Sequence, residues 1–548
     1  MKPKAAVLLQ VMLAVAVSTL PAWGHAEATA PSGVKPGEQK LGTVNFPTSC
    51  TPAAQQQFER AVAMVHSFFY PDTLKAFQGV VDTDASCAIG YWGIAISQRP
   101  NPLVGPFDEA TLKRGLETAQ KGLAIPPKTE REHDWLAAIE VFYKDYAKID
   151  QDTRALAYEQ AMERLVQKYP ADSEAAIFYA LALNETASHA DKTFAKQLKA
   201  AAILEKIDRE QPDHPGVTHY LIHSYDYTPL ADKGLKYANK YAQVAPAAPH
   251  AQHMPSHIYS MLGLWEESVK SNQASLAVAN ETAARLWPGT GKYHQSVGHL
   301  WDFMEYAYLQ MGQDAQARKV RDDAVAAKEF GVDNLANFTG LAAVEARYVL
   351  ERGAWKEAMA LQPRSSRWPQ AEAVTYFARA LGAARGGDAA AAQADIGKLK
   401  EMRAKLEQAH QDYWAEQTEV QILAASAWLA KLNGNSDEAL KLMRAAANLE
   451  DSSEKHVAME NRLYPMREIL ADVLLEMKRP ADALKEYDAS MLAMPNRLRG
   501  FSGAAQAAEQ SGDKTKAMAY YRKLNVLTAK ADSDRPEIRA ARAYVAQQ

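Results

Sequence analysis

The spacing of four histidines constrains the fold of this chain more than any other feature. His219 and His223 are four residues apart, as are His253 and His257, and the second pair follows the first by 34 residues at both positions. Thirty-four residues is the period of the tetratricopeptide repeat, a pair of helices that stacks on its neighbours. Residues at i and i+4 share one helix face, so both pairs would face the same way on neighbouring repeats. The sequence therefore predicts an all-α tetratricopeptide-repeat solenoid, wound as a right-handed superhelix.

The rest of the chain is compatible with such an array. Glycine and proline are modest in number, 28 and 26 in 548 residues, and alanine is abundant, which favours helices over sheets. We expect helical repeats that carry the histidines over residues 46–361 and a more regular array of repeats over 371–548. The intervening stretch 362–370 contains two prolines and is interpreted as a kink or linker. Each helix pair needs its neighbours to bury its apolar face.

The first 26 residues have the pattern of an export signal. Lys2 and Lys4 precede an apolar stretch, Ala5 to Leu20, which Pro21 ends before small residues suited to cleavage. The alternative is an uncleaved membrane anchor. Residues 27–45 are rich in Pro, Gly and Lys and are expected to form a flexible leader. A cleaved signal implies a periplasmic or secreted protein with no integral membrane segment.

The only two cysteines are Cys50 and Cys87. In an exported protein such a pair is more often bridged than free, and adjacent repeats would bring these two positions together. We therefore expect a disulfide. The alternative is two buried thiols.

The histidines fall into register when the repeat's turn glycine is used as a marker. With Gly263 at position 15 of its repeat, and with Gly312 at position 15 of a later one, His or Asp occurs repeatedly at positions 2, 5 and 9 of the first helix. These positions face the concave groove of a tetratricopeptide array. The residues are His219 and His223 at positions 5 and 9, His250, His253 and His257 at 2, 5 and 9, and His299, Asp302 and Tyr306 at 2, 5 and 9 of the third repeat.

This register predicts a metal site in the groove. Imidazoles from packed helices can reach one ion, and neutral imidazole suits zinc, copper or iron. The expected ligands are His219, His223, His250, His253, His257, His299 and Asp302; Asp226, Tyr306, His294 and His456 are expected around them, oriented as hydrogen-bond partners. The alternatives are a metal-free polar groove and an accident of composition, although eight of the 14 histidines lie between residues 214 and 299.

Several stretches resemble a family of exported bacterial tetratricopeptide-repeat proteins, with the vertebrate tetratricopeptide repeat protein 38 as a distant relative. They begin at Cys87 (CAIGYWGIA), His214 (HPGVTHYLIHSYD) and Pro249 (PHAQHMPSHIY), and two shorter ones are Glu454–His456 and Pro465–Glu468. The resemblance implies a helical repeat fold with the same histidine-bearing groove, and it implies no reaction. After His456 this chain departs from the family pattern, because Val457–Asn461 replaces a proline-rich run.

A superhelix of this kind closes a turn in seven or eight repeats, so a late repeat can lie across from an early one. His456 and Glu468 are therefore expected to cap the histidine cluster from the opposite wall, although a surface loop and a solvated helix face are equally compatible with the sequence. If the protein is an enzyme, Glu305 or Glu468 would transfer protons during metal-assisted hydrolysis or oxidation.

The sequence leaves the function open. No phosphate loop, H-E-x-x-H, nucleophile elbow or C-x-x-C is present. A metal-dependent enzyme, an interaction scaffold and a metal storage or delivery protein all remain possible. The partner would be a peptide, protein or small molecule in the groove. A net charge of −4 without a basic stripe argues against nucleic acid.

Overall fold

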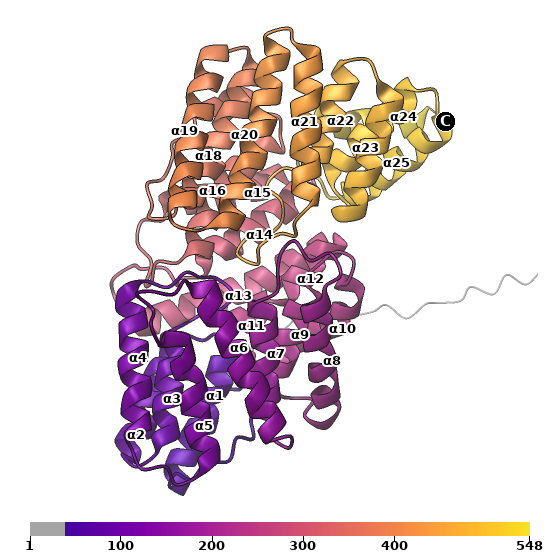
Figure 1. Ribbon diagram of the computed structural model, residues 1–548. Coiled ribbons are helices and arrows are strands. Elements are labelled where there is room, and N and C mark those ends of the chain that lie inside the picture. The colour runs from indigo at the N-terminus through magenta and orange to yellow at the C-terminus, as the bar shows by residue number, and fades with distance from the viewer. Residues whose placement is uncertain (1–38, 548) are drawn as a thin grey trace, which may run out of the picture. The chain divides into compact units, whose positions relative to one another are not determined.

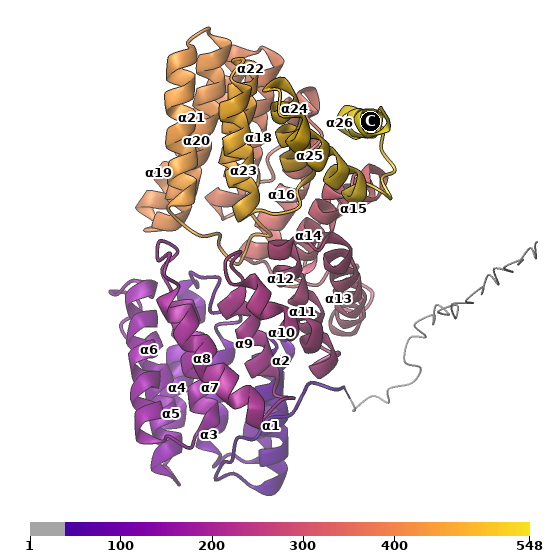
Figure 2. The ribbon, with the colours of Figure 1, turned by 90° about the vertical axis from the view of Figure 1, so that its right-hand side faces the viewer.

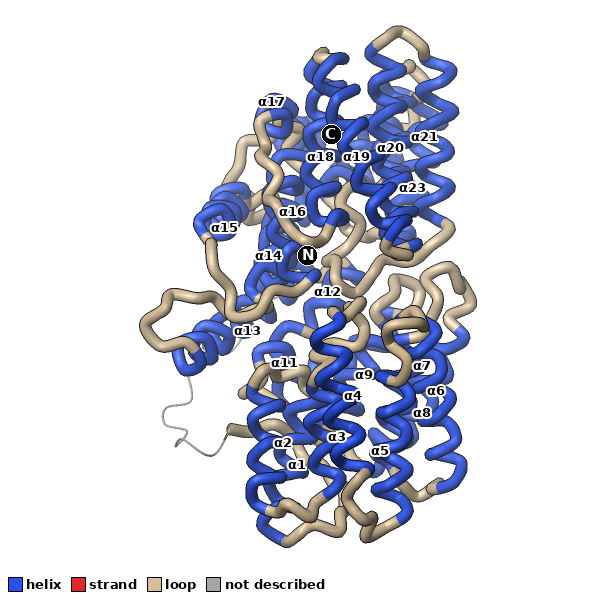
Figure 3. Tube along the Cα trace, turned by 60° about the vertical axis from the view of Figure 1, so that its left-hand side comes forward, coloured by secondary structure: helices blue, strands red, loops and turns tan. Residues whose placement is uncertain are grey.

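The structure, a computed structural model, describes residues 39–547 and is helical throughout that range (Figure 1). Only an isolated bridge between Tyr293 and Phe330 departs from helix and loop there, and Figure 3 shows the helices joined by loops of varied length. Among these residues, no helix is both long and apolar enough to cross a bilayer. The expected signal, residues 1–26, lies outside the described part.

The helices follow one another as antiparallel pairs. Those of the first half are α1 (Pro52–His66), α2 (Asp72–Thr83), α3 (Ala88–Ser97), α4 (Glu109–Leu123), α5 (Glu130–Tyr143), α6 (Gln151–Lys168), α7 (Ser173–Glu185), α8 (Ala195–Glu210), α9 (Pro215–Tyr225), α10 (Ala231–Val244), α11 (Pro249–His253), α12 (Pro255–Leu262) and α13 (Trp265–Leu286). Those of the second half are α14 (Val297–Gln310), α15 (Asp314–Ala326), α16 (Leu335–Leu350), α17 (Trp355–Met359), α18 (Pro369–Gly386), α19 (Ala389–Gln408), α20 (Asp412–Leu432), α21 (Ser436–Asp451), α22 (Met466–Glu476), α23 (Pro480–Ala493), α24 (Leu498–Gln510), α25 (Lys514–Leu527) and α26 (Pro536–Ala546).

The turns carry the tetratricopeptide signature. Gly263 and Gly312, the two position-15 glycines, adopt φ values of 67° and 68°. This left-handed conformation ends a helix without the steric cost that a side chain would add. The prediction of an all-α, tetratricopeptide-type repeat fold is confirmed.

The hydrophobic interior falls into two large clusters along the solenoid. One runs from Leu41 to Met261 and the other from Trp265 to Ala541. The change therefore comes at the Gly263 turn, about 100 residues before the expected boundary at 362–370. Figure 2 shows α9, α11, α12 and α14 in succession where one half of the stack passes into the other.

The last part of the expected flexible leader contacts the hydrophobic core. Leu41 and Phe46 are buried in the first core, and the Thr43 N–H donates to the backbone oxygen of Asp213 at 3.0 Å. Residues 40–45 thus pack against the repeats, because two large apolar side chains within this polar stretch find places in the core.

A disulfide joins Cys50, just before α1, to Cys87, at the start of α3, with Cα atoms 4.9 Å apart. The bridge links the two ends of the first helix pair, so it reduces the conformational entropy of the unfolded chain between residues 50 and 87.

Replacing both cysteines by alanine should lower the free energy of unfolding. The bonded residues are 37 apart in sequence, and the loop-entropy relation gives a loss of about 4 kcal/mol. Urea unfolding followed by circular dichroism measures it, and dithiothreitol-treated parent protein is the control, since it should unfold with the double variant. A loss under about 1 kcal/mol would show that the bridge does not stabilise the fold.

Candidate metal centre

Six of the predicted histidines form two triads. Triad 1 is His219 and His223 of α9 with His250 of α11; triad 2 is His253, at the end of α11, with His257 of α12 and His299 of α14. In each triad the candidate ligand nitrogens lie within 4.8 Å of one another. Each triad combines the histidines at positions 5 and 9 of one repeat with the histidine at position 2 of the next repeat.

The helix that carries triad 2 is broken. The first helix of the repeat that ends at Gly263 consists of two pieces, α11 and α12, with Met254 between them. Pro255 explains the break, because its ring removes one backbone N–H and crowds the preceding turn. His253 and His257 therefore sit on either side of the break.

The ring nitrogens within each triad lie close together. In triad 1, Nε2 of His219 lies 3.0 Å from Nε2 of His223 and 3.0 Å from Nε2 of His250. In triad 2, Nε2 of His253 lies 3.0 Å from Nε2 of His257. Two nitrogens that each sit about 2.05 Å from one ion are about 2.9–3.4 Å apart at bond angles of 90–109°. The spacing matches a shared ion.

The hydrogen-bond partners of the Nδ1 atoms show which nitrogen of each ring carries the proton. Nδ1 of His219 lies 2.6 Å from the backbone oxygen of His66, and Nδ1 of His257 lies 2.8 Å from Oδ2 of Asp226. Both partners only accept hydrogen bonds, so both Nδ1 atoms are protonated.

Nδ1 of His253 is held in the same way. It lies 2.7 Å from Oδ1 of Asn272, whose amide donates to the backbone oxygen of Ser268. In His219, His253 and His257 the Nε2 lone pairs are therefore free, and those of His253 and His257 face each other within triad 2.

Burial keeps the triads neutral. Five of the six side chains are at most 7% exposed, and only His250 is more open. Burial lowers the pKa of His253 to about 4. In the remaining five triad histidines, burial and then the repulsion of neighbouring imidazoles lower the pKa well below the usual value. Neutral imidazole is the form that binds metal.

A third cluster has similar distances but different hydrogen bonding. Glu174 accepts from His66 at 2.9 Å and from His214 at 2.8 Å. Nδ1 of His214 itself accepts from the N–H of Val217 at 3.3 Å, so Nε2 must carry the ring proton. Nδ1 of His66 is paired with the Tyr220 hydroxyl at 3.0 Å. This cluster is satisfied internally as a structural network, and we do not assign a metal to it.

A loop from the second half closes over the triads. The closing loop, residues 452–465 between α21 and α22, brings Nζ of Lys455 to 2.9 Å from Oδ2 of Asp226, the same oxygen that faces His257. The N–H of Glu454 donates to the backbone oxygen of His189 at 2.8 Å. The histidines therefore lie in an enclosed site, whereas the sequence predicts an open concave groove.

The expected ligand Asp302 lies outside both triads. Its Oδ1 accepts from Nε of Arg347 at 2.8 Å, and both side chains are fully buried. Arg347 also donates to the backbone oxygen of Asn461 and so anchors the closing loop. The ligand prediction is corrected because the guanidinium from α16 holds this carboxylate.

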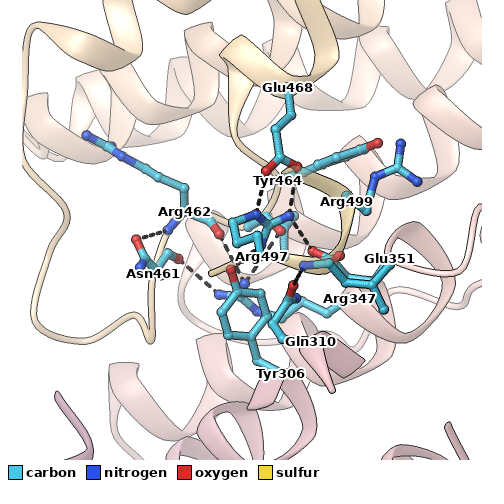
Figure 4. A network of polar contacts seen from close by, with 12 residues as sticks. Tyr306, Gln310, Arg347, Glu351, Asn461, Arg462, Tyr464, Glu468, Arg497 and Arg499 are labelled. Atoms are coloured by element: carbon cyan, nitrogen blue, oxygen red, sulfur yellow. Dashed lines mark hydrogen bonds and ion pairs between the residues drawn. The ribbon is translucent and has the colours of Figure 1, made fainter. Parts of the chain in front are cut away.

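The two expected proton-transfer residues are not at the triads either. Glu468 pairs with Arg497 through contacts of 2.7 and 3.0 Å, in the network that Figure 4 shows. Tyr306, expected beside the metal, bonds the same guanidinium. Glu305 is fully buried with no hydrogen-bond partner in the described chain, and burial raises its pKa well above the usual value. It belongs to neither triad.

Two histidines expected around the metal take other positions. Nδ1 of His294 pairs with the Ser296 hydroxyl at 2.9 Å. His456 packs its ring on Trp414 and His189, with centroids 4.9 and 5.3 Å apart, and its Nδ1 accepts from the N–H of Ala458. Of the four expected orienting residues, only Asp226 contacts a triad.

Sequence reasoning missed three residues that support the triads: the His66 backbone oxygen, Asn272 and Lys455. Lys455 stands next to His456 in the Glu454–His456 stretch. The sequence therefore pointed to the loop that reaches the site, but the residue that makes the contact is Lys455 and not His456. Asn272 lies 19 residues after His253, on the second helix of the same repeat, and no motif in the sequence marks it.

Comparison with known proteins defines little beyond this fold. No family model and no curated protein matches the chain. Among solved structures, the human IFIT1 dimer with m7Gppp-AAAA is similar at 12% identity and a TM-score of 0.37, covering 81% of this chain and 90% of that one. A monomeric IFIT1 mutant with Gppp-AAAA is similar at 13% identity and a TM-score of 0.38, with 80% and 90% covered.

Because these TM-scores are low, the RNA caps in those structures imply nothing for this chain, and the expectation that nucleic acid is not a partner stays a prediction. The chain is thus a tetratricopeptide-type repeat protein with histidine clusters that can hold metal.

The metal-free protein should lose stability as the pH falls below about 6.5. In the folded state the triad pKa values are lowered, so between pH 6.5 and about 4 the unfolded chain binds more protons. Each such histidine can contribute up to about 1.4 kcal/mol per pH unit. Urea unfolding of chelator-treated protein at several pH values gives the slope. The slope should be shallower in His219→Gln/His253→Gln and unchanged in His133→Gln, at an exposed site. Equal slopes in all three proteins would mean that the triads are not buried neutral clusters.

Proposed function

We propose that the protein binds two transition-metal ions, one in each triad, and that it is a metal-dependent enzyme. The observation that carries the proposal is the convergence of Nε2 atoms at 3.0 Å within each triad, with the opposite nitrogens of His219, His253 and His257 bonded to fixed acceptors. In triad 2, without a cation, the facing Nε2 lone pairs of His253 and His257 would repel each other in a buried site.

The charge balance supports reactive ions. Six neutral imidazoles bring no negative charge, and the one carboxylate that contacts a triad, Asp226, is already paired with Lys455. Two divalent ions would therefore be under-neutralised, which favours an anionic ligand such as hydroxide at a remaining coordination position, or copper in its monovalent state. A three-histidine site leaves such a position free, as hydrolytic and oxidative metal centres require.

Imidazole donors suit zinc, copper or iron, and copper(II) binds most tightly to a given nitrogen site. Metal storage or delivery remains the alternative, since the same triads would serve it. An interaction scaffold is less well supported, because the histidines are enclosed by the closing loop and cannot line a surface for a peptide.

We further propose export to the periplasm or the cell exterior and membership of the exported bacterial family that the chain resembles. The Cys50–Cys87 disulfide supports an oxidising compartment. The histidine stretches from His214 and Pro249 supply five of the six triad histidines, which supports a shared site in that family.

The metal content of untagged mature protein, measured by inductively coupled plasma mass spectrometry, tests the proposal. The parent should hold two ions per chain. His219→Ala should remove the ion of triad 1 and His253→Ala that of triad 2, so each single variant should hold one and the double variant none. His133→Ala, at an exposed position of α5, is the matched control and should hold two.

Circular dichroism shows whether each variant is folded. A folded parent that takes up neither zinc, copper nor iron after incubation would exclude both the enzyme and the storage protein. One ion in the parent, lost in both single variants, would replace two sites with one shared site.

A further inference from the structure

A cavity adjoins triad 1. It lies where the α7–α8 connection, the end of α9 and the closing loop meet, and its wall includes Asn184, His189, His223, Asp226, Tyr227 and Lys455. His223 is a triad 1 ligand, whereas no residue of triad 2 lines the cavity. The three triad 2 histidines are at most 7% exposed. Of the two triads, triad 1 is therefore the one that contributes a residue to the wall of this cavity.

The wall of this cavity offers hydrogen-bond acceptors that have no partner. Oδ2 of Asp226 is engaged by both Lys455 and His257, but Oδ1 is buried without a hydrogen bond in the described chain. Nδ1 of His189 is likewise buried and unpartnered there. Leaving a buried acceptor unpaired costs about 1–3 kcal/mol, so a ligand that donates to these atoms gains that energy.

Two of the donors in the wall have partners within the protein. The Lys455 ammonium pairs with Asp226, and the Asn184 amide donates to the Ser224 hydroxyl at 3.0 Å. Two unused acceptors, one of them anionic, beside an engaged cation favour a neutral ligand with donor groups over an anion. Leu103 and Val457 add apolar surface to the same wall.

We infer that this cavity is the substrate site of triad 1 and takes a small neutral molecule with two hydroxyl or amino groups, which donate to Asp226 and His189. The inference rests on the proposed function, because the bound molecule would meet the ion on the side of His223. Triad 2 contributes no residue to the wall of this cavity, so its ion would not face a molecule bound there.

Resorcinol and its dimethyl ether are the probes, because they share a ring and differ in their hydroxyl donors. Isothermal titration of the full chain with its two ions bound should detect resorcinol, and the ether should bind about tenfold more weakly or not at all. His189→Phe keeps a flat ring and removes the acceptor, so it should weaken resorcinol about tenfold. Ala187→Trp, in the cavity wall, should abolish binding by filling the space.

His133→Phe is the matched control for His189→Phe and should bind resorcinol as the parent does. Metal content is measured on every sample, so a parent without ions counts against the proposed function and not against the cavity. With two ions bound, the inference is overturned if the parent does not bind resorcinol, if the ether binds equally well, or if both cavity variants behave like the control.

Discussion

The candidate site depends on hydrogen bonds to the outer nitrogens of its imidazoles. A histidine ring can turn either nitrogen inward, and only the unprotonated one binds metal. Here a backbone oxygen, an amide and a carboxylate hold three of the rings with their protons outward. The cluster of His66, Glu174 and His214 shows the contrast. The distances within it are similar, but the N–H of Val217 fills one nitrogen of His214 and sends the ring proton towards Glu174. Distance alone therefore does not separate a metal site from a structural network, whereas proton placement does.

The repeat register accounts for how much of the fold and the site was predictable. The 34-residue spacing of His219 and His253 reflects a real translation of one repeat onto the next, and all six triad residues were predicted as ligands. The sequence does not reveal how they are divided. His250 shares a repeat with His253, yet it binds across to α9, because position 2 of one first helix lies beside positions 5 and 9 of the preceding one. The same offset brings His299 to triad 2.

Contacts between distant parts of the chain were the least predictable. The idea that late repeats lie across from early ones holds at Lys455 and Asp226, which are 229 residues apart. It fails for Glu468, which Arg497 engages. Small rotations from repeat to repeat accumulate along a solenoid, so the register of a loop some 200 residues away cannot be read to a single residue. Whether a buried carboxylate faces a metal or a guanidinium is decided by that register.

The two triads have the same ligands, so any difference in reactivity must come from their surroundings. Triad 2 is enclosed by α12, α14 and its own support from Asn272 and Asp226. Triad 1 has the more exposed His250, and His223 at the wall of a cavity that the closing loop completes. Duplication of a repeat can supply two equal sites, but a difference between them needs another part of the chain. That part is the second half, because its closing loop places Lys455 on Asp226 at the cavity wall. The C-terminal repeats, which contribute no ligand to either triad, thereby determine which proposed ion a substrate can reach.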